Sequence, residues 1–180
     1  PALIAPSVDG RGESFDIAIR LLAAMVKYGL STTAENQVSM SPADLVADNI
    51  VAISSLSETL GRTFHVTRDE YSSMKDLTDL LAERTGATFS LHELDAFVPE
   101  IVSRCRKEDL LFPLLNFLVR SVDNIAAMEF KLYDSAQYRW ARSRATRGRE
   151  DPPLDQVVDG LVAFMDRHGL IDVVEPAGRI

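Results

Sequence analysis

The residues of this chain whose types and spacing could carry out chemistry begin with Tyr71 and Lys75, four positions apart. A lysine one helical turn from a tyrosine lowers the pKa of the phenol, which can then act as a general acid on a carbonyl. We expect the local helix to begin only around Ser73, so Tyr71 precedes it and the two side chains need not share a face. We therefore interpret the pair as a helix-entry tyrosine beside a surface lysine and predict no catalytic residue in the chain.

Other reactive side chains are few and scattered. Cys105 is the only cysteine, which excludes an intramolecular disulfide and a cysteine-based metal site. The three histidines, His65, His92 and His168, are far apart and lack the spacing of metal ligands. We predict that His65, in an alternating β-branched stretch, is a core or interface histidine. No metal site is expected.

A dinucleotide needs a glycine-rich turn that admits its pyrophosphate at a helix N-terminus. The nearest candidate is Gly10-Arg11-Gly12, which lacks the third glycine. We predict that this chain alone binds no dinucleotide.

Composition indicates one ordinary domain, or a helical domain with a few elements of a second. The chain has 180 residues, 46% hydrophobic and 26% charged, which is typical of a globular protein. A net charge of -8 argues against nucleic-acid binding. The five arginines between Arg139 and Arg149 are interpreted as solvated surface, with contact to an anion as the alternative. No apolar run is long enough for a membrane helix, and no signal peptide opens the chain, so a cytoplasmic location is expected. A start at Pro1 rather than Met indicates a processed, tagged or excised segment.

The first third of the chain has the pattern of alternating helices and extended segments. Ser14 is the expected N-cap of a helix that ends at Gly29, and Pro42 is expected at the first position of a helix with Leu45, Ile50 and Ile53 inward. This order predicts α/β layers. The expected extended segments are Ala2–Ala5, Gln37–Met40 and Thr63–Thr67.

After Tyr71 the pattern is mainly helical. Leu94, Phe97, Val98 and Ile101 form an apolar stripe at helical spacing. The expected elements are helices over 73–85 (closed by Gly86), 91–105, 110–128 (bent at Pro113), 137–144 and 154–168, with one short strand over 88–91.

Three segments of the first third resemble the last third of an extended short-chain dehydrogenase/reductase. They are Pro1-Ala2-Leu3-Ile4-Ala5-Pro6, Ser41-Pro42-Ala43-Asp44-Leu45-Val46-Ala47 and Gly61-Arg62-Thr63-Phe64-His65-Val66. From residue 69 to about 171 the chain resembles the C-terminal subdomain of thioester reductases of nonribosomal peptide and polyketide synthetases. That resemblance rests on Leu110 to Phe117, on Tyr133-Asp134, and on Pro152-Pro153-Leu154-Asp155 with the closing helix.

The resemblance implies a helix-rich α/β fold. Residues 1–68 would be the distal strands and helices of a Rossmann-like sheet, 69–171 a mainly helical substrate-binding subdomain, and 172–180 a flexible tail. The intact family enzyme uses NADPH to release an acyl or peptidyl thioester from the phosphopantetheine arm of a carrier protein, as aldehyde or alcohol. The partners implied are therefore a carrier protein and an N-terminal reductase core. This chain alone is expected to be inactive and to hold no cofactor.

The resemblance also implies site residues. Pro1, Ala2, Leu3 and Ile4 would lie beside the nicotinamide. Met40 and Pro42 would border the cleft, and Phe112, Asn116 and Phe117 would line the acyl channel. Two alternatives stay open: a non-catalytic module that binds a carrier protein or another protein, and part of a redox-inactive release domain that cyclises its thioester.

Overall fold

The computed structural model describes residues 2–13, 16–126 and 132–171 and has a helix-rich α/β fold. Its elements, in chain order, are β1 (Ala2–Ala5), α1 (Ile17–Tyr28), β2 (Leu30–Thr32), β3 (Gln37–Pro42), α2 (Ala43–Ser54), the 3-10 turn η1 (Ser57–Thr59), β4 (Ser72–Ser73), α3 (Met74–Thr85), β5 (Ser90–His92), α4 (Leu94–Arg104), the 3-10 turn η2 (Phe112–Leu114), α5 (Leu115–Ala126), α6 (Ala136–Arg144) and α7 (Leu154–Arg167).

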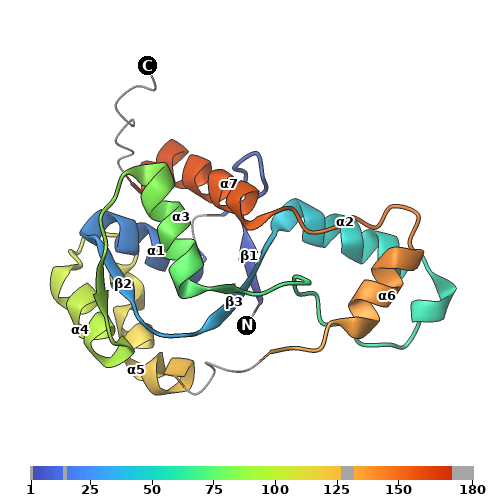
Figure 1. The fold of residues 1–180 in the computed structure, drawn as a ribbon, viewed down its shortest axis with the longest axis horizontal. Coiled ribbons are helices and arrows are strands. Elements are labelled where there is room, and N and C mark those ends of the chain that lie inside the picture. Colours follow the sequence, from blue (N-terminus) through green and yellow to red (C-terminus); the bar gives the residue numbers. More distant parts are fainter. Residues whose placement is uncertain (1, 14–15, 127–131, 172–180) are drawn as a thin grey trace.

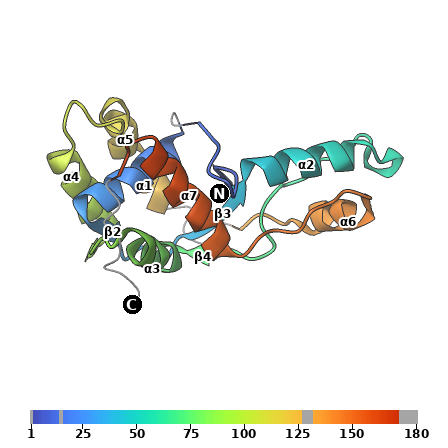
Figure 2. The ribbon, with the colours of Figure 1, turned by 90° about the horizontal axis from the view of Figure 1, so that it is seen from above.

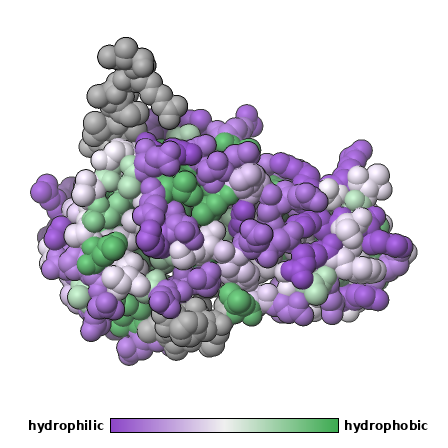
Figure 3. Space-filling view, in the orientation of Figure 1, coloured by the Kyte–Doolittle hydropathy of each residue, from purple (hydrophilic) through white to green (hydrophobic). Residues whose placement is uncertain are grey.

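The elements form a body with an arm that extends from it (Figure 1). The arm consists of α2, η1 and α6, and Figure 2 shows α2 and α6 lying side by side along it. The body holds the strands and the remaining helices. On the face drawn in Figure 3 the arm is mainly hydrophilic, whereas hydrophobic side chains gather on the body.

Two small sheets run through the body. β1 pairs with β3 in parallel, with Leu3 opposite Met40, and β4 adds to the other edge of β3 in antiparallel orientation. β2 pairs with β5 in parallel, with Ser31 opposite Leu91. The β1–β3 connection contains α1, as parallel strands require a long crossover. Among the described residues, β1 has a partner on one edge only.

The body has one hydrophobic core to which α1, α3, α4 and α7 all contribute. Met25, Leu81, Ile101 and Phe164 are completely buried in it. Burial of each such side chain contributes roughly 1.5–3 kcal/mol, so this cluster dominates the stability of the body. The arm has only a small cluster around Ile53, Tyr138 and Ala141.

The ends of α1 follow local chemistry. Its N-cap is Asp16, whose carboxylate accepts hydrogen bonds from the backbone N–H groups of Ala18 and Ile19. The prediction of Ser14 as the N-cap was therefore wrong, because a carboxylate two residues later takes the exposed N–H groups. The C-terminal end was predicted correctly: Gly29 adopts φ 62°, the left-handed conformation that glycine adopts without a steric penalty.

α2 begins one residue later than the sequence suggested, because Pro42 is its N-cap and belongs to β3. Leu45 and Ile53 are buried as expected, but Ile50 is half exposed to solvent. The neighbouring Asn49 is buried in its place, because its amide is fully hydrogen-bonded inside the arm.

The predicted strand Thr63–Thr67 is not a strand in the structure. The segment runs between the arm and the body, where the backbone N–H of Arg68 donates to the hydroxyl of Ser39 at 2.9 Å. The β-branched residues of Thr63–Thr67 have no partner strand in the described part of the chain, and without one they do not form a sheet. His65 in this segment is exposed and contacts the ring of Tyr133 edge-on, so it is not a core histidine.

The helical second part was predicted well. Ser73 caps α3 through a capping box with Asp76, and Gly86 closes that helix with φ 72°. α6 and α7 lie where expected, whereas α4 begins at Leu94, three residues later than predicted, because β5 extends to His92. The long segment around Pro113 divides into η2 and α5. The short strand lies at Ser90–His92, two residues beyond the predicted start. The predicted tail 172–180 lies outside the described residues.

Candidate functional site

An apolar pocket of about 170 Å³ lies between α1, α4, α5 and the residues that connect β2 to β3. Thirteen residues line it and ten of them are apolar, so it can receive a hydrocarbon group. They are Leu21, Met25, Val38, Met74, Leu94, Phe97, Val98, Ile101, Leu118 and Ile125, with the polar residues Thr32, Asn36 and Gln37.

The lining residues of α4 and α5 recur at helical spacing, so their side chains face the pocket. On α4, Leu94, Phe97, Val98 and Ile101 recur at intervals of three and four residues, which places them on one face of the helix. On α5, Leu118 and Ile125 are two turns apart and face the same way. The apolar stripe of the sequence therefore forms one wall of the pocket as well as part of the core.

The polar side of the pocket is held by the β2–β3 connection. The amide of Asn36 donates to the backbone carbonyl of Ile125 at 3.2 Å, which ties this connection to the last turn of α5. The hydroxyl of Thr32 accepts from the backbone N–H of Ala34 at 3.1 Å. Asn36 and Gln37 are only half-buried, so the polar groups lie where the pocket approaches solvent.

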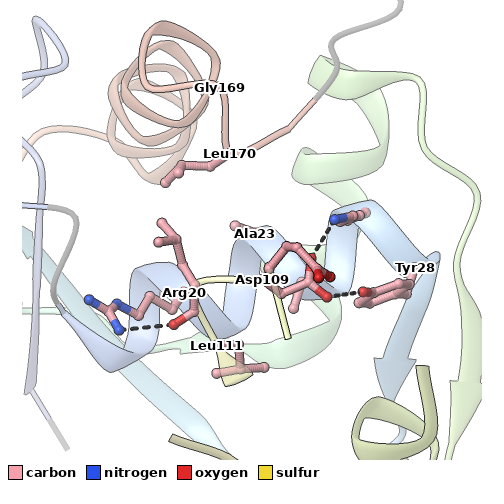
Figure 4. A pocket seen from close by; sticks show the side chains of 11 residues that line it. Arg20, Ala23, Tyr28, Asp109, Leu111, Gly169 and Leu170 are labelled. Atoms are coloured by element: carbon pink, nitrogen blue, oxygen red, sulfur yellow. Dashed lines mark hydrogen bonds and ion pairs between the residues drawn. The ribbon is translucent and has the colours of Figure 1, made fainter. Parts of the chain in front are cut away.

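A second, smaller pocket of about 110 Å³ lies between α1 and the residues that precede η2. Figure 4 shows Asp109 and Tyr28 pointing toward one another at one end, with Leu170 above α1 in this view. The carboxylate of Asp109 accepts hydrogen bonds from Tyr28 Oη, Lys27 Nζ and the backbone N–H of Arg106.

These contacts set the protonation states at the second pocket. Burial disfavours the Asp109 carboxylate, but its three hydrogen bonds outweigh burial and lower its pKa to about 2. Burial and the bond to Asp109 raise the pKa of Tyr28 to about 12. Burial also raises the pKa of Cys105 to about 11, so its thiol stays protonated and is a poor nucleophile. We interpret this cluster as a structural tie between α1 and the 105–111 segment.

Tyr71 and Lys75 make contacts with different partners. Tyr71 precedes α3 and its hydroxyl accepts from the backbone N–H of Tyr133 at 3.1 Å. Lys75 forms an exposed ion pair with Asp79 on α3. Each side chain is used in a different direction, as the interpretation from the sequence required.

Some of the five arginines between Arg139 and Arg149 form ion pairs with carboxylates of the same chain. Arg142 binds Asp69 and Asp151, and Arg149 binds Asp44 and Asp48. These pairs join α6 and its following loop to α2 and to the body. The interpretation as mainly solvated surface was therefore wrong for Arg142, whose side chain is 9% exposed.

The residues expected beside the cofactor lie on β1. Pro1 is outside the described residues. Ala2 pairs with Ser39, Leu3 is half-buried, and Ile4 is 44% exposed. Their proposed role stays a prediction, and the exposed Ile4 is the side chain available for it.

The residues expected to bind substrate lie in two places. Met40 and Pro42 are buried in β3. Phe112, Asn116 and Phe117 are exposed at the start of the η2–α5 segment. None of the five lines the apolar pocket, and their role in binding substrate stays a prediction.

The two helices that follow β1 and β3 do not fit a dinucleotide pyrophosphate. Asp16 caps α1 with its carboxylate, and Asp44 lies in the first turn of α2, so each N-terminus already carries a negative charge. Gly10 does not supply a cradle, because a Cβ there would lie 3.3 Å from Ala163 Cβ on α7. A negative charge at each of these N-termini disfavours a pyrophosphate there.

Sequence reasoning missed the pocket because its walls come from distant segments. Only the α4 stripe was visible as a pattern, and it predicted an amphipathic helix but not a pocket. The available signal was a pair of amides at the start of a buried strand: Asn36 directly precedes β3 and Gln37 is its first residue.

The described residues contain no cluster of three or more histidine, cysteine or carboxylate side chains suited to a metal ion. None of the helices in these ranges is both long and apolar enough to cross a membrane.

No protein-family model matches this sequence, and no curated protein matches it. Solved structures do resemble it. The terminal R domain from the myxalamid PKS-NRPS biosynthetic pathway has a TM-score of 0.83 at 18% identity, over 96% of this chain and 44% of that chain. A thiolation-reductase di-domain from an archaeal non-ribosomal peptide synthetase has a TM-score of 0.66 at 18% identity, over 94% and 35%. The PhqB reductase domain from Penicillium fellutanum has a TM-score of 0.60 at 17% identity, over 94% and 46%. This chain spans less than half of the length of each of these reductase-domain structures. Within that part it has the same fold, which confirms the predicted fold relationship with thioester reductases.

Proposed function

We propose that this chain is the substrate-binding, C-terminal part of an NAD(P)H-dependent thioester reductase. In this role it receives the acyl or peptidyl group of a carrier-protein thioester, which the complete enzyme releases as aldehyde or alcohol. The observation that carries the proposal is the correspondence with the myxalamid terminal R domain over 96% of the chain. The apolar pocket supports it, because an acyl group needs a hydrocarbon-lined space.

The proposal assigns the cofactor phosphates to residues outside this chain. The acidic starts of α1 and α2 disfavour a pyrophosphate there, and the open edge of β1 is suited to pairing with a further strand. A nicotinamide would supply the hydride, and β1, with the exposed Ile4, would border it.

A carrier protein bearing a phosphopantetheine arm is the proposed partner. Support comes from the second structural neighbour, which is a thiolation-reductase di-domain. We place the protein in the cytoplasm, where such synthetases would meet NADPH.

The test uses the chain joined to the residues encoded before Pro1. This protein is mixed with hexanoyl-loaded carrier protein and NADPH, and the loss of NADPH absorbance and the released product are measured. Aldehyde or alcohol formation that consumes NADPH supports the proposal. The matched control is this chain alone, which should bind the loaded carrier protein but consume no NADPH.

Two other outcomes would replace the proposal. Binding of the loaded carrier protein without NADPH consumption by the extended protein would indicate a binding module. A cyclised product formed without NADPH would indicate a redox-inactive release domain.

A further inference from the structure

The volume of the apolar pocket limits what it can hold. Pockets for drug-sized ligands measure roughly 300–1,000 Å³. The pocket here measures about 170 Å³. An engineered apolar cavity of about 150 Å³ binds one benzene molecule. The space therefore matches one compact hydrocarbon group of about six carbons and is too small for a long acyl chain.

The inner end of the pocket is fixed. Met25 and Ile101 are completely buried, and Phe97 and Leu118 are each 4% exposed. All four belong to the main core, so the pocket cannot lengthen inward without disrupting the packing of α1, α4 and α5. A longer ligand would have to leave its additional carbons in solvent.

The lining also selects by charge. None of the thirteen lining residues is charged, and the polar ones are Thr32, Asn36 and Gln37. A carboxylate or ammonium group inside would lose its hydration without gaining a partner, which is strongly unfavourable. The uncharged hydrocarbon end of a ligand can enter, while the polar part of the same ligand extends out of the pocket past Asn36 and Gln37.

We propose that this pocket binds the distal end of the acyl group and selects a compact, uncharged hydrocarbon of about six carbons. The inference rests on the proposed function, because it takes the ligand to be an acyl thioester. It goes further by naming the class of acyl group.

The experiment measures the affinity of this chain for pantetheine thioesters with acyl groups of two to twelve carbons, by isothermal titration calorimetry. Affinity should rise about fourfold per methylene up to hexanoyl, from the transfer free energy of a buried methylene. Beyond six to eight carbons it should stay constant. Benzene is measured as a hydrocarbon probe without a thioester.

Two substitutions at Val98, which lines the pocket and is 6% exposed, connect the result to this site. Val98→Phe fills the space and should weaken hexanoyl binding by about tenfold or more. Val98→Ala enlarges the space and should move the plateau one to two carbons higher. Val119→Phe is the matched control, because Val119 is 50% exposed and does not line the pocket. Thermal unfolding of each variant verifies that it is folded.

Each outcome decides a different claim. A plateau near six carbons that shifts with Val98→Ala supports the inference. A steady rise through dodecanoyl, or binding that is insensitive to both Val98 variants, overturns it. Binding of benzene but of no thioester overturns the assignment to an acyl group and counts against the proposed function. A plateau with no NADPH-dependent reduction by the extended protein leaves the pocket assignment intact and rejects only the reductase.

Discussion

The side-chain amide of Asn49 donates to the hydroxyl of Tyr138 at 2.8 Å, with both residues buried between α2 and α6. The same amide group donates to the backbone carbonyl of Arg149 and accepts from its N–H. Because the apolar cluster of the arm is small, this polar network holds the two helices together.

Replacing Asn49 with alanine should destabilise the protein by about 2–3 kcal/mol, because three hydrogen bonds are lost and buried groups are left unpaired. Tyr138→Phe removes one bond and should cost about 1 kcal/mol. Urea unfolding measures both. Val51→Ala on the exposed side of α2 is the control and should change stability by less than about 0.5 kcal/mol. Equal losses for Asn49→Ala and Val51→Ala would contradict the network.

Arg142 binds Asp69 at 2.6 Å and Asp151 at 3.4 Å, and the side chains of Arg142 and Asp151 are 9% and 8% exposed. Arg142→Met leaves the Asp151 carboxylate buried without a cation, so we expect a loss of about 3 kcal/mol in the free energy of unfolding. Arg144→Met, at an exposed pair with Glu58, should cost less than about 1 kcal/mol. If chemical denaturation gives similar losses in the free energy of unfolding for Arg142→Met and Arg144→Met, the buried Arg142 contacts contribute no more than an exposed pair.

Asp109 should contribute to acid unfolding. Its pKa in the folded chain is about 2, below the ordinary value of 3.8, so its stabilisation is complete above pH 3.8 and is lost as pH falls toward 2. Asp109→Asn should remove this part of the pH dependence and cost about 1 kcal/mol at pH 7, a value reduced for the solvent access of Lys27. Asp79→Asn, at an exposed pair with Lys75, is the control. The free energy of unfolding is measured between pH 2 and 7. If it falls with decreasing pH in Asp109→Asn as it does in the unchanged protein, the prediction is refuted.

Gly160 tests the contact of α7 with the 7–8 segment. Alanine normally stabilises a helix interior by about 0.5–1 kcal/mol relative to glycine. A Cβ at position 160 would lie 2.6 Å from the backbone carbonyl oxygen of Ser7, so the sign should reverse and Gly160→Ala should destabilise by about 1–3 kcal/mol. Gln156→Ala on the exposed side of α7 should be neutral. A higher melting temperature for Gly160→Ala would disprove the close contact.

What the sequence predicted correctly was governed by local chemistry. Gly29 and Gly86 end their helices in the left-handed conformation, as predicted, because a helix C-cap needs only neighbouring residues. The fold relationship was also recognisable from short motifs. Thr63–Thr67 failed because strand formation depends on a partner that local propensity does not specify.

The candidate site was less accessible to prediction. The pocket combines Leu21, Val38, Ile101 and Ile125, which are far apart in sequence, and each also has the pattern of an ordinary core residue. Asn49 was missed for a similar reason, since periodicity alone favoured Ile50. Neither choice could be made without knowing which segments meet in space.

The contact between α7 and the N-terminal loop has a consequence for biosynthesis. Arg167 donates to the backbone carbonyls of Gly10 and Asp9, and Gly160 packs on Ser7, so residues at the two ends of the described chain meet. During synthesis the loop after β1 leaves the ribosome long before its partner helix is made. The body can complete its packing only after translation of α7, so the nascent chain exposes apolar surface until that helix has been made.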